Sequence, residues 1–263
     1  MTLMPETPLS DLNSSGSPFR SLPVQSAPLQ SASSVSDLAA VLHECGPIPR
    51  TAAFLGVALD GLPILLNLQD PTPGPLLIVG DPASGKRRLL QVVARAADLA
   101  HPTGGIRHAV MTDQPRDWEA FGLSASCEGI LPFHHPLTRR YVASLAESAR
   151  AARSPRRHLL LLVDGLEALA ADPEIRTDMF WLLENGPFNS IWPIVAVTTP
   201  RTSALAEWLK PFRTVLCGRN SGVPSQLEAG KPAFDGSRTL TSGAQFALLT
   251  GDEWLPFWVP EPL

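Results

Sequence analysis

A short apolar stretch, a glycine-containing loop and an amphipathic segment follow one another in residues 76–100. The stretch LLIV at 76–79 has the length and apolarity of a buried strand, and residues 87–100 have helical spacing. The loop between them has the spacing G-x-x-x-x-G-K and consists of Gly80, Asp81, Pro82, Ala83, Ser84, Gly85 and Lys86. This order is the setting that a phosphate-binding loop requires. It predicts an α/β fold with a phosphate site; the alternative is a glycine-rich turn of another α/β fold.

The parts of this loop have separate roles in holding a phosphate. The two glycines let the loop turn its amides inward, and the helix that follows presents the positive end of its dipole. Lys86 supplies a positive charge that reaches the β and γ phosphates of a nucleotide. We therefore predict that residues 80–87 bind ATP and that Lys86 also takes part in catalysis.

The position after Lys86 departs from the motif. A Ser or Thr is expected there, because its hydroxyl ligates Mg²⁺, but this chain has Arg87 followed by Arg88. Either Arg87 points outward and water replaces the hydroxyl, or its guanidinium takes the place of the metal ion. In the second case the site binds nucleotide without efficient hydrolysis.

A second apolar stretch ends in an acidic residue. Residues 158–163 (HLLLLV) predict a strand, and Asp164 follows it in a position to hold a water bound to Mg²⁺; the alternative is an aspartate that caps a helix. Gly165 stands where many motor proteins with a phosphate loop have a glutamate that activates the attacking water. Glu167 is a candidate base, or else a solvated residue in the first turn of a helix. The departures at 87 and 165 both indicate slow or absent hydrolysis.

Strand patterns and helix patterns alternate through the rest of the chain. Further strands are predicted at 107–112, 192–198 and 213–217. Helices are predicted at 36–45, with Ser36 as its cap, and at 87–100, 137–153, 175–184 and 203–208. Hairpins are predicted around Asp60-Gly61 and, at the edge of the sheet, around Thr250-Gly251-Asp252. The alternation predicts a mostly parallel sheet flanked by helices, with antiparallel hairpins at its edge.

Composition separates a tail from a folded domain. Residues 1–33 are rich in Ser and Pro without apolar periodicity, which predicts a disordered tail, and residues 34–263 are expected to form one domain. The net charge of −4 argues against a protein whose whole surface coats nucleic acid. The 3 cysteines have no C-x-x-C spacing and are expected to be free thiols. With no signal-peptide pattern and no long apolar run, we expect a soluble, cytoplasmic protein without a membrane segment.

Two further groups of residues have open interpretations. Six arginines between 139 and 157 are accompanied by one acid, Glu147, and could meet phosphates or form a solvated helix face. They are Arg139, Arg140, Arg150, Arg153, Arg156 and Arg157. Trp254, Phe257 and Trp258 fit core aromatics better than a platform for stacking bases.

From Phe54 to Pro260 the chain resembles the FtsK/SpoIIIE-type branch of the HerA/FtsK P-loop ATPases, which includes ATPase modules of type VII secretion. LGVALDGLPILLNL is similar to the family's hairpin before its phosphate loop, and GPLLIVGDPASGK to its strand and loop. LLLLVDGLEAL stands where the family has its acidic strand, and QFALLTGDEWLPFWVP resembles its closing hairpin. The resemblance implies a RecA-like P-loop NTPase fold. Asp-Gly-Leu-Glu after an apolar strand also resembles signalling NTPases of the NACHT type, whose helical additions we do not find in the sequence.

The resemblance also implies a function and further site residues. IVAVTTPR is similar to the strand that ends in a polar sensor, often Gln, which makes Thr199 a candidate catalytic residue. Arg219, after the strand in FRTVLCGRN, is a candidate arginine finger acting in trans, or else a turn arginine. The implied function is ATP turnover, with Mg²⁺, coupled to DNA or protein translocation, in a homo-oligomer or with a partner ATPase. The alternative is a catalytically degenerate nucleotide-binding scaffold or regulatory subunit.

Overall fold

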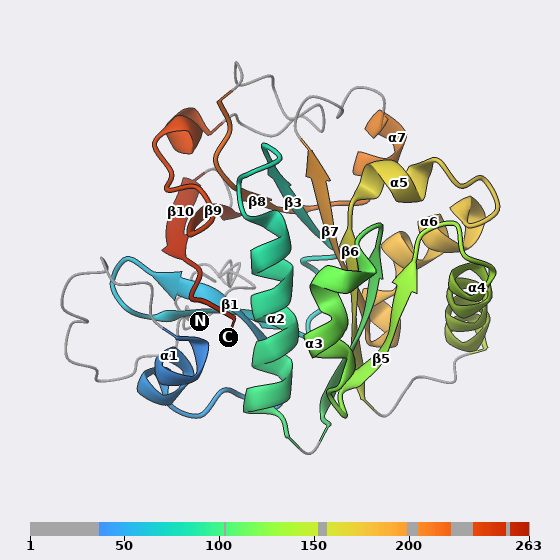
Figure 1. Cartoon of the computed structure of the whole chain (residues 1–263), viewed down its shortest axis with the longest axis horizontal. Coiled ribbons are helices and arrows are strands. Elements are labelled where there is room, and N and C mark those ends of the chain that lie inside the picture. The colour runs from blue at the N-terminus through green and yellow to red at the C-terminus, as the bar shows by residue number, and fades with distance from the viewer. Residues whose placement is uncertain are drawn as a thin grey trace, which may run out of the picture.

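A computed structural model describes residues 37–102, 104–151, 157–198, 205–221, 234–250 and 253–262. The predicted tail at 1–33 lies outside these ranges. The strands are β1 (Ala52–Ala58), β2 (Pro63–Asn67), β3 (Leu76–Gly80), β4 (Ile106–Thr112), β5 (Cys127–Pro132), β6 (His158–Asp164), β7 (Ile191–Thr198), β8 (Thr214–Cys217), β9 (Gln245–Thr250) and β10 (Glu253–Trp258). They form one sheet in the order β2-β1-β10-β9-β8-β3-β7-β6-β4-β5 (Figure 1).

The sheet has a parallel part and an antiparallel part. Strands β8, β3, β7, β6, β4 and β5 pair in parallel. The two hairpins, β1-β2 and β9-β10, form the antiparallel part, in which β10 pairs with β1 and β9 pairs with β8. The predicted fold class is confirmed. The prediction that the closing hairpin lies at the edge of the sheet is wrong: β1 pairs with β10, so this hairpin lies between β1 and the parallel strands, and β2 is the outermost strand.

Helices flank the sheet and, from the second helix onward, connect its parallel strands. They are α1 (Leu38–Cys45), α2 (Lys86–Ala100), α3 (Glu119–Gly122), α4 (Pro136–Arg150), α5 (Leu166–Ala170), α6 (Arg176–Asn185) and α7 (Ala206–Leu209), with short 3₁₀ segments η1 (Pro115–Trp118), η2 (Pro187–Asn189) and η5 (Asp235–Arg238). The first helix begins later than predicted, because Asp37 is its N-terminal flanking residue and makes no side-chain cap bond. Sequence patterns missed β5 and α3, since both are short and β5 is half-buried along its whole length. No helix in the described ranges is long and apolar enough to cross a membrane.

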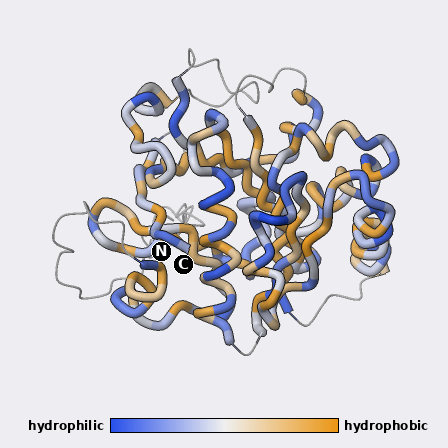
Figure 2. Tube along the Cα trace, in the orientation of Figure 1, coloured by the Kyte–Doolittle hydropathy of each residue, from blue (hydrophilic) through white to orange (hydrophobic). Residues whose placement is uncertain are grey.

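The apolar strands bury side chains on both faces of the sheet. Along β3, Leu76 and Ile78 pack with the apolar residues of α1, α2 and α3, whereas Leu77 and Val79 pack with those of α4 to α7. Figure 2 shows this apolar interior following the strands, with hydrophilic residues at the periphery. Such two-sided burial is why the parallel strands have near-continuous apolar runs rather than alternation.

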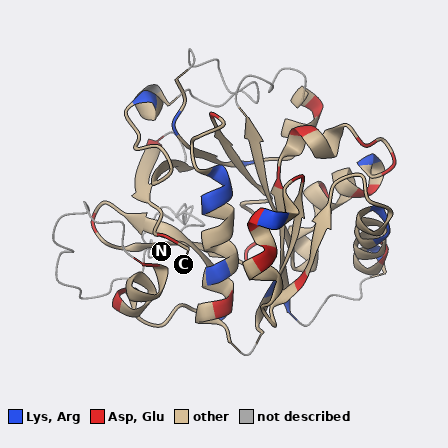
Figure 3. Ribbon diagram, viewed as in Figure 1, with Lys and Arg blue, Asp and Glu red and all other residues tan. Residues whose placement is uncertain are grey.

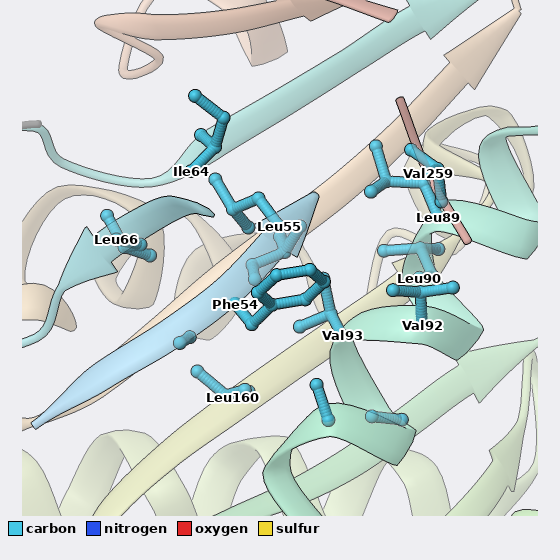
Figure 4. Close-up of a cluster of buried hydrophobic side chains, with 14 of the residues drawn as sticks. Phe54, Leu55, Ile64, Leu66, Leu89, Leu90, Val92, Val93, Leu160 and Val259 are labelled. Carbon is cyan, nitrogen blue, oxygen red and sulfur yellow. The ribbon is translucent and has the colours of Figure 1, made fainter. Parts of the chain in front are cut away.

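Helix α2 holds the site against the core. It crosses one face of the sheet, in front of it in Figure 1, and its buried residues lie on one side of the helix. Figure 4 shows this contact, in which residues of α2 approach the first hairpin and the chain end: Phe54, Leu55, Leu89, Leu90, Val92, Val93 and Val259. Each fully buried side chain of this size contributes about 1.5–3 kcal/mol. The first turn of α2 is therefore fixed relative to β3.

Candidate functional site

The predicted phosphate loop joins the end of β3 to the start of α2. Gly85 has φ +90°, and a Cβ at this position would lie 2.5 Å from the Cα of Gly243, so only glycine fits there. The first hydrogen bond that closes a turn of α2 runs from the amide of Leu89 to the carbonyl of Gly85, at 3.0 Å. The amides of residues 86–88 have no acceptor among the described residues, so they are available to an anion.

Lys86 is held inside the loop. Its side chain is largely buried, with 8% of the residue exposed, and its Nζ donates hydrogen bonds to the carbonyls of Gly80 (2.8 Å) and Asp81 (2.6 Å). Burial lowers the pKa of Lys86 to about 8, while the nearby carboxylates of Glu167, Asp81 and Asp164 act to raise it. The third N–H of the ammonium has only a long bond, to the hydroxyl oxygen of Ser84 at 3.5 Å, which a phosphate oxygen could replace. The loop therefore has a fixed cation and free amides, as phosphate binding requires.

Two distant segments hold the loop in place. The Asp81 carboxylate accepts hydrogen bonds from the backbone amide (2.7 Å) and the hydroxyl (2.5 Å) of Ser221. The Asp81 amide donates to the carbonyl of Arg219 at 3.0 Å, and the Gly243 amide donates to the carbonyl of Ser84 at 3.2 Å. Residues between β8 and β9 are thus hydrogen-bonded to the loop. The sequence offered no sign of these contacts, because they join positions far apart in the chain.

Arg87 points into the site. Its Nε donates to Oδ2 of Asp164 at 2.6 Å, and its terminal nitrogens pair with Asp117 and, at 3.8 Å, with Asp113. Figure 3 shows the basic residues at the start of α2 beside the acidic residues around α3. Of the two interpretations of Arg87, the structure shows the second, in which the side chain turns inward and its guanidinium lies against Asp164.

Asp164 is a buried acceptor at the end of β6. The same Oδ2 that meets Arg87 also accepts from the hydroxyl of Thr112 (3.1 Å) and from Nε1 of Trp118 (3.2 Å). Burial raises the pKa of Asp164, and the three donors act to lower it. The alternative role as a helix cap is excluded, because Gly165 precedes α5 and no side-chain cap bond is present there.

These residues do not fit Mg²⁺. The ion needs oxygen ligands in octahedral geometry, but no hydroxyl follows Lys86, and a guanidinium lies against the only carboxylate at the end of β6. No group of three or more His, Cys, Asp or Glu in the described part of the chain could hold a metal ion. The predicted Mg²⁺ ligand, Asp164, is therefore an ion-pair partner of Arg87.

Glu167 faces the same pocket from the first turn of α5. Its Oε1 accepts a hydrogen bond from the amide of Thr198 at 2.6 Å, which ties α5 to the end of β7. The pocket has a volume of about 580 Å³, and its walls include two cations, Lys86 and Arg87, and three carboxylates, Asp113, Asp164 and Glu167. Glu167 is half-buried, so the interpretation as a fully solvated helix residue does not hold.

The structure brings together most of the predicted site residues. The loop, Asp164 and Glu167 all surround the pocket. Thr199 lies outside the described residues, directly after Thr198. Arg219 is exposed, and its backbone meets the phosphate loop of its own chain.

Sequence analysis missed the second acidic strand end. Thr112 and Asp113 close β4, which pairs with β6 in parallel so that Thr112 lies opposite Asp164. Because the carboxyl ends of parallel strands meet at one edge of a sheet, these residues reach the site. The polar residues Thr112 and Asp113, at the end of the predicted strand at 107–112 and directly after it, were a usable signal.

The other predicted clusters have structural roles. Arg139 pairs with Asp172 (2.8 Å) and Glu174 (2.7 Å), and Arg150 pairs with Asp178 (2.9 Å), so acids balance these arginines. Arg153 and Arg156 lie outside the described residues. In the closing hairpin, Phe257 is fully buried and stacks with Phe246, and Trp254 packs against Phe234, as expected of core aromatics.

Comparison with known proteins identifies the fold. No protein-family model matches the sequence, and neither does any curated protein. A structure of ATPases 2 and 3 of Thermomonospora curvata EccC, in complex with a signal sequence peptide, has a TM-score of 0.63 at 16% identity over 83% of this chain and 41% of that chain. EssC ATPases 2 and 3 from Geobacillus thermodenitrificans give 0.61 at 16% identity, over 84% of this chain and 44% of that one.

A third solved structure comes from a different process. The pCW3 conjugation coupling protein TcpA, in its monomer form with ATPγS, has a TM-score of 0.56 at 13% identity over 82% of this chain and 67% of that chain. The chain spans less than half the length of the EccC and EssC chains that it matches. All three are similar in the arrangement of the sheet and helices at low sequence identity. The described domain therefore has the fold of the FtsK/HerA-type P-loop ATPases.

Proposed function

We propose that this domain binds a nucleotide within an assembly of ATPase domains and holds it without efficient hydrolysis. The observation that carries the proposal is the 2.6 Å hydrogen bond between Arg87 Nε and Asp164 Oδ2. In ATPases of this fold, that acidic position and the residue after the loop lysine hold Mg²⁺. Here the two positions bind each other instead.

Nucleotide binding is supported by the intact half of the site. Gly85 has the backbone conformation that the loop needs, and the amides that follow it are free of described acceptors. The Lys86 ammonium is held in the loop by hydrogen bonds to the carbonyls of Gly80 and Asp81. A charged donor of this kind stabilises a phosphate by about 1.5–3 kcal/mol.

Slow turnover is supported by the position of the acidic groups. Gly165 has no side chain with which to activate water, and its φ of +130° favours glycine. Glu167 is the remaining acid of α5 near the loop, but one of its oxygens accepts the Thr198 amide. A general base must reach the attacking water, and a carboxylate already bound to the backbone is less free to do so.

The test measures binding and turnover separately. We expect calorimetry to detect nucleotide binding by the wild-type chain and a large loss in Lys86→Ala, with Lys210→Ala, an exposed lysine elsewhere on the surface, as the control. We expect phosphate release with Mg²⁺, with and without DNA, to stay at the background level. Equal affinity in wild type and Lys86→Ala would refute the binding site, and robust phosphate release would refute the absence of turnover.

A second candidate function is an active motor that translocates DNA or protein. The complete loop and the likeness to secretion and conjugation ATPases favour it. In such motors an arginine from a neighbouring subunit completes the site, and we propose Arg219 for this role because it is exposed beside the loop. Light scattering over a range of concentrations, with and without nucleotide, would then show a homo-oligomer or dependence on a partner ATPase. A monomer whose nucleotide binding ignores Arg219→Ala would count against the motor.

A further inference from the structure

The positive groups of the pocket are concentrated at the phosphate loop. The free amides of residues 86–88 and the Lys86 ammonium all belong to the loop and the first turn of α2. The carbonyls of Gly80 and Asp81 and the hydroxyl of Ser84 hold Nζ within the loop. This arrangement suits one phosphate group at the start of α2.

The negative groups come from other segments than the loop, namely the ends of β4 and β6 and the first turn of α5. Asp113, Asp164 and Glu167 line the same pocket as the loop, so a chain of phosphates that extends from the loop meets these acids, and Arg87 is the cation that contacts them. Arg87 is already shared by Asp164, Asp117 and Asp113. The five charged residues of the pocket wall, two cations and three acids, thus carry a net charge of −1.

Arg87 is poorly placed to turn toward an additional phosphate. The Asp164 side chain is only 9% exposed, so moving the guanidinium away would leave a buried carboxylate without its cation. Removing one partner of a buried ion pair is costly. Mg²⁺, which would otherwise neutralise a third phosphate, does not fit this donor set.

From this distribution of charge we infer that the site binds a nucleoside diphosphate, without a metal ion, in preference to a triphosphate. The inference rests on the proposed nucleotide-binding function and specifies its ligand. The additional negative charge of a triphosphate lies among carboxylates in a half-enclosed pocket. Repulsion between a phosphate and a carboxylate about 4 Å apart is enough to change an affinity about tenfold.

Calorimetry with ADP and with ATP tests the inference on the wild-type chain. In EDTA we expect ADP to bind about tenfold more tightly than ATP, and we expect MgCl₂ to change either affinity by no more than about twofold. ATP that binds as tightly as ADP in EDTA would overturn the inference. So would a rise of about tenfold in ATP affinity on addition of MgCl₂.

A substitution of Glu167 tests the cause of the preference. Glu167→Gln keeps an oxygen that can accept the Thr198 amide and removes only the charge. It should narrow the ratio of ADP to ATP affinity about threefold. Glu184→Gln, on an exposed position of α6, is the matched control and should leave the ratio unchanged. An unchanged ratio in Glu167→Gln would show that this carboxylate does not set the preference.

The outcomes separate this inference from the function on which it rests. If neither nucleotide binds, or if both bind equally well to Lys86→Ala, the proposed function fails. If both bind through Lys86 but ATP binds as tightly as ADP, only the diphosphate preference fails. The wild-type comparison needs no variant, so a poorly folded mutant does not leave the question open.

Discussion

The two sides of the candidate site differ in how far they keep the chemistry of an ATPase. On the loop side, Gly85 and Lys86 have the backbone and side-chain positions that phosphate binding needs. On the side of the acidic strand, Arg87 binds Asp164, and Gly165 follows it without a carboxylate. The loop side has the residues of a phosphate-binding loop, whereas on the other side an ion pair joins the two positions that hold Mg²⁺ in ATPases of this fold.

This difference shows that binding and turnover have separate structural requirements within one pocket. Holding a phosphate depends on backbone amides and one lysine, all within a single loop. Hydrolysis also needs a metal ion and a base from other strands. A chain can therefore lose the second set of groups without disturbing the strand, loop and helix that provide the first.

Loss of the loop cation is the strongest test of the comparison. Lys86→Ala should weaken nucleotide binding about a hundredfold, because the charged hydrogen bonds to phosphate are lost. Calorimetry measures the affinity, and the melting temperature checks that the variant is folded. An affinity unchanged in the folded variant would mean that the loop side is not a phosphate site.

Removal of the ion pair should sharpen the contrast on the other side. Arg87→Ser restores a hydroxyl and frees Asp164, so ATP affinity should rise about tenfold on adding MgCl₂, in contrast to the wild type. The free energy of unfolding should fall by about 1–3 kcal/mol, because Asp164 loses a charged donor. Titration calorimetry and denaturant unfolding measure these effects, with Arg95→Ser in the same helix as the control.

Turnover requires one more change. Phosphate release should become measurable in the double variant Arg87→Ser, Gly165→Glu, once its melting temperature shows that position 165, with φ +130°, holds a side chain in the folded protein. Release should be lower in Arg87→Ser alone, since the base is still missing there. Release from Arg87→Ser equal to that from the double variant would show that Glu167 already serves as the base.

The pH dependence of binding should report on Lys86. Its pKa of about 8 means that the free loop loses a proton above this pH, whereas bound phosphate keeps the lysine charged. Nucleotide affinity should therefore fall with rising pH above pH 8, by up to about tenfold per unit. Calorimetry at pH 7, 8 and 9 tests this, and Lys86→Ala should show no such fall. A wild-type affinity independent of pH would contradict the buried environment of the lysine.

The smallest effect on nucleotide affinity is expected from the contact of Ser221 with the loop residue Asp81. Ser221→Ala removes the hydroxyl bond to Asp81 and keeps the backbone bond, so nucleotide affinity should fall about threefold. Ser148→Ala, at an exposed position of α4, is the control. An affinity equal to that of wild type would show that the backbone bonds alone hold the loop.

Local sequence patterns predicted most of the helices and strands of this protein, though not β5 and α3, and they predicted the loop side of its candidate site. The strand at 76–79, the loop and the helix after it were predictable because their residues are adjacent, and each part constrains the next. The apolar strand before Asp164 was predictable for the same reason. These segments imply a parallel sheet before any contact between them is known.

The tertiary structure decided what the acidic half contains. The sequence left open whether Arg87 turns outward or inward. Its partners come from two separate segments: Asp113 and Asp117 follow β4, and Asp164 ends β6. The order of strands places β4 beside β6, and this pairing brings Thr112 and Asp113 to the pocket. Local propensity and periodicity describe neighbours along the chain. The ion pair between Arg87 and Asp164 depends instead on which strand ends lie next to each other. The packing of the whole sheet sets this order of strands.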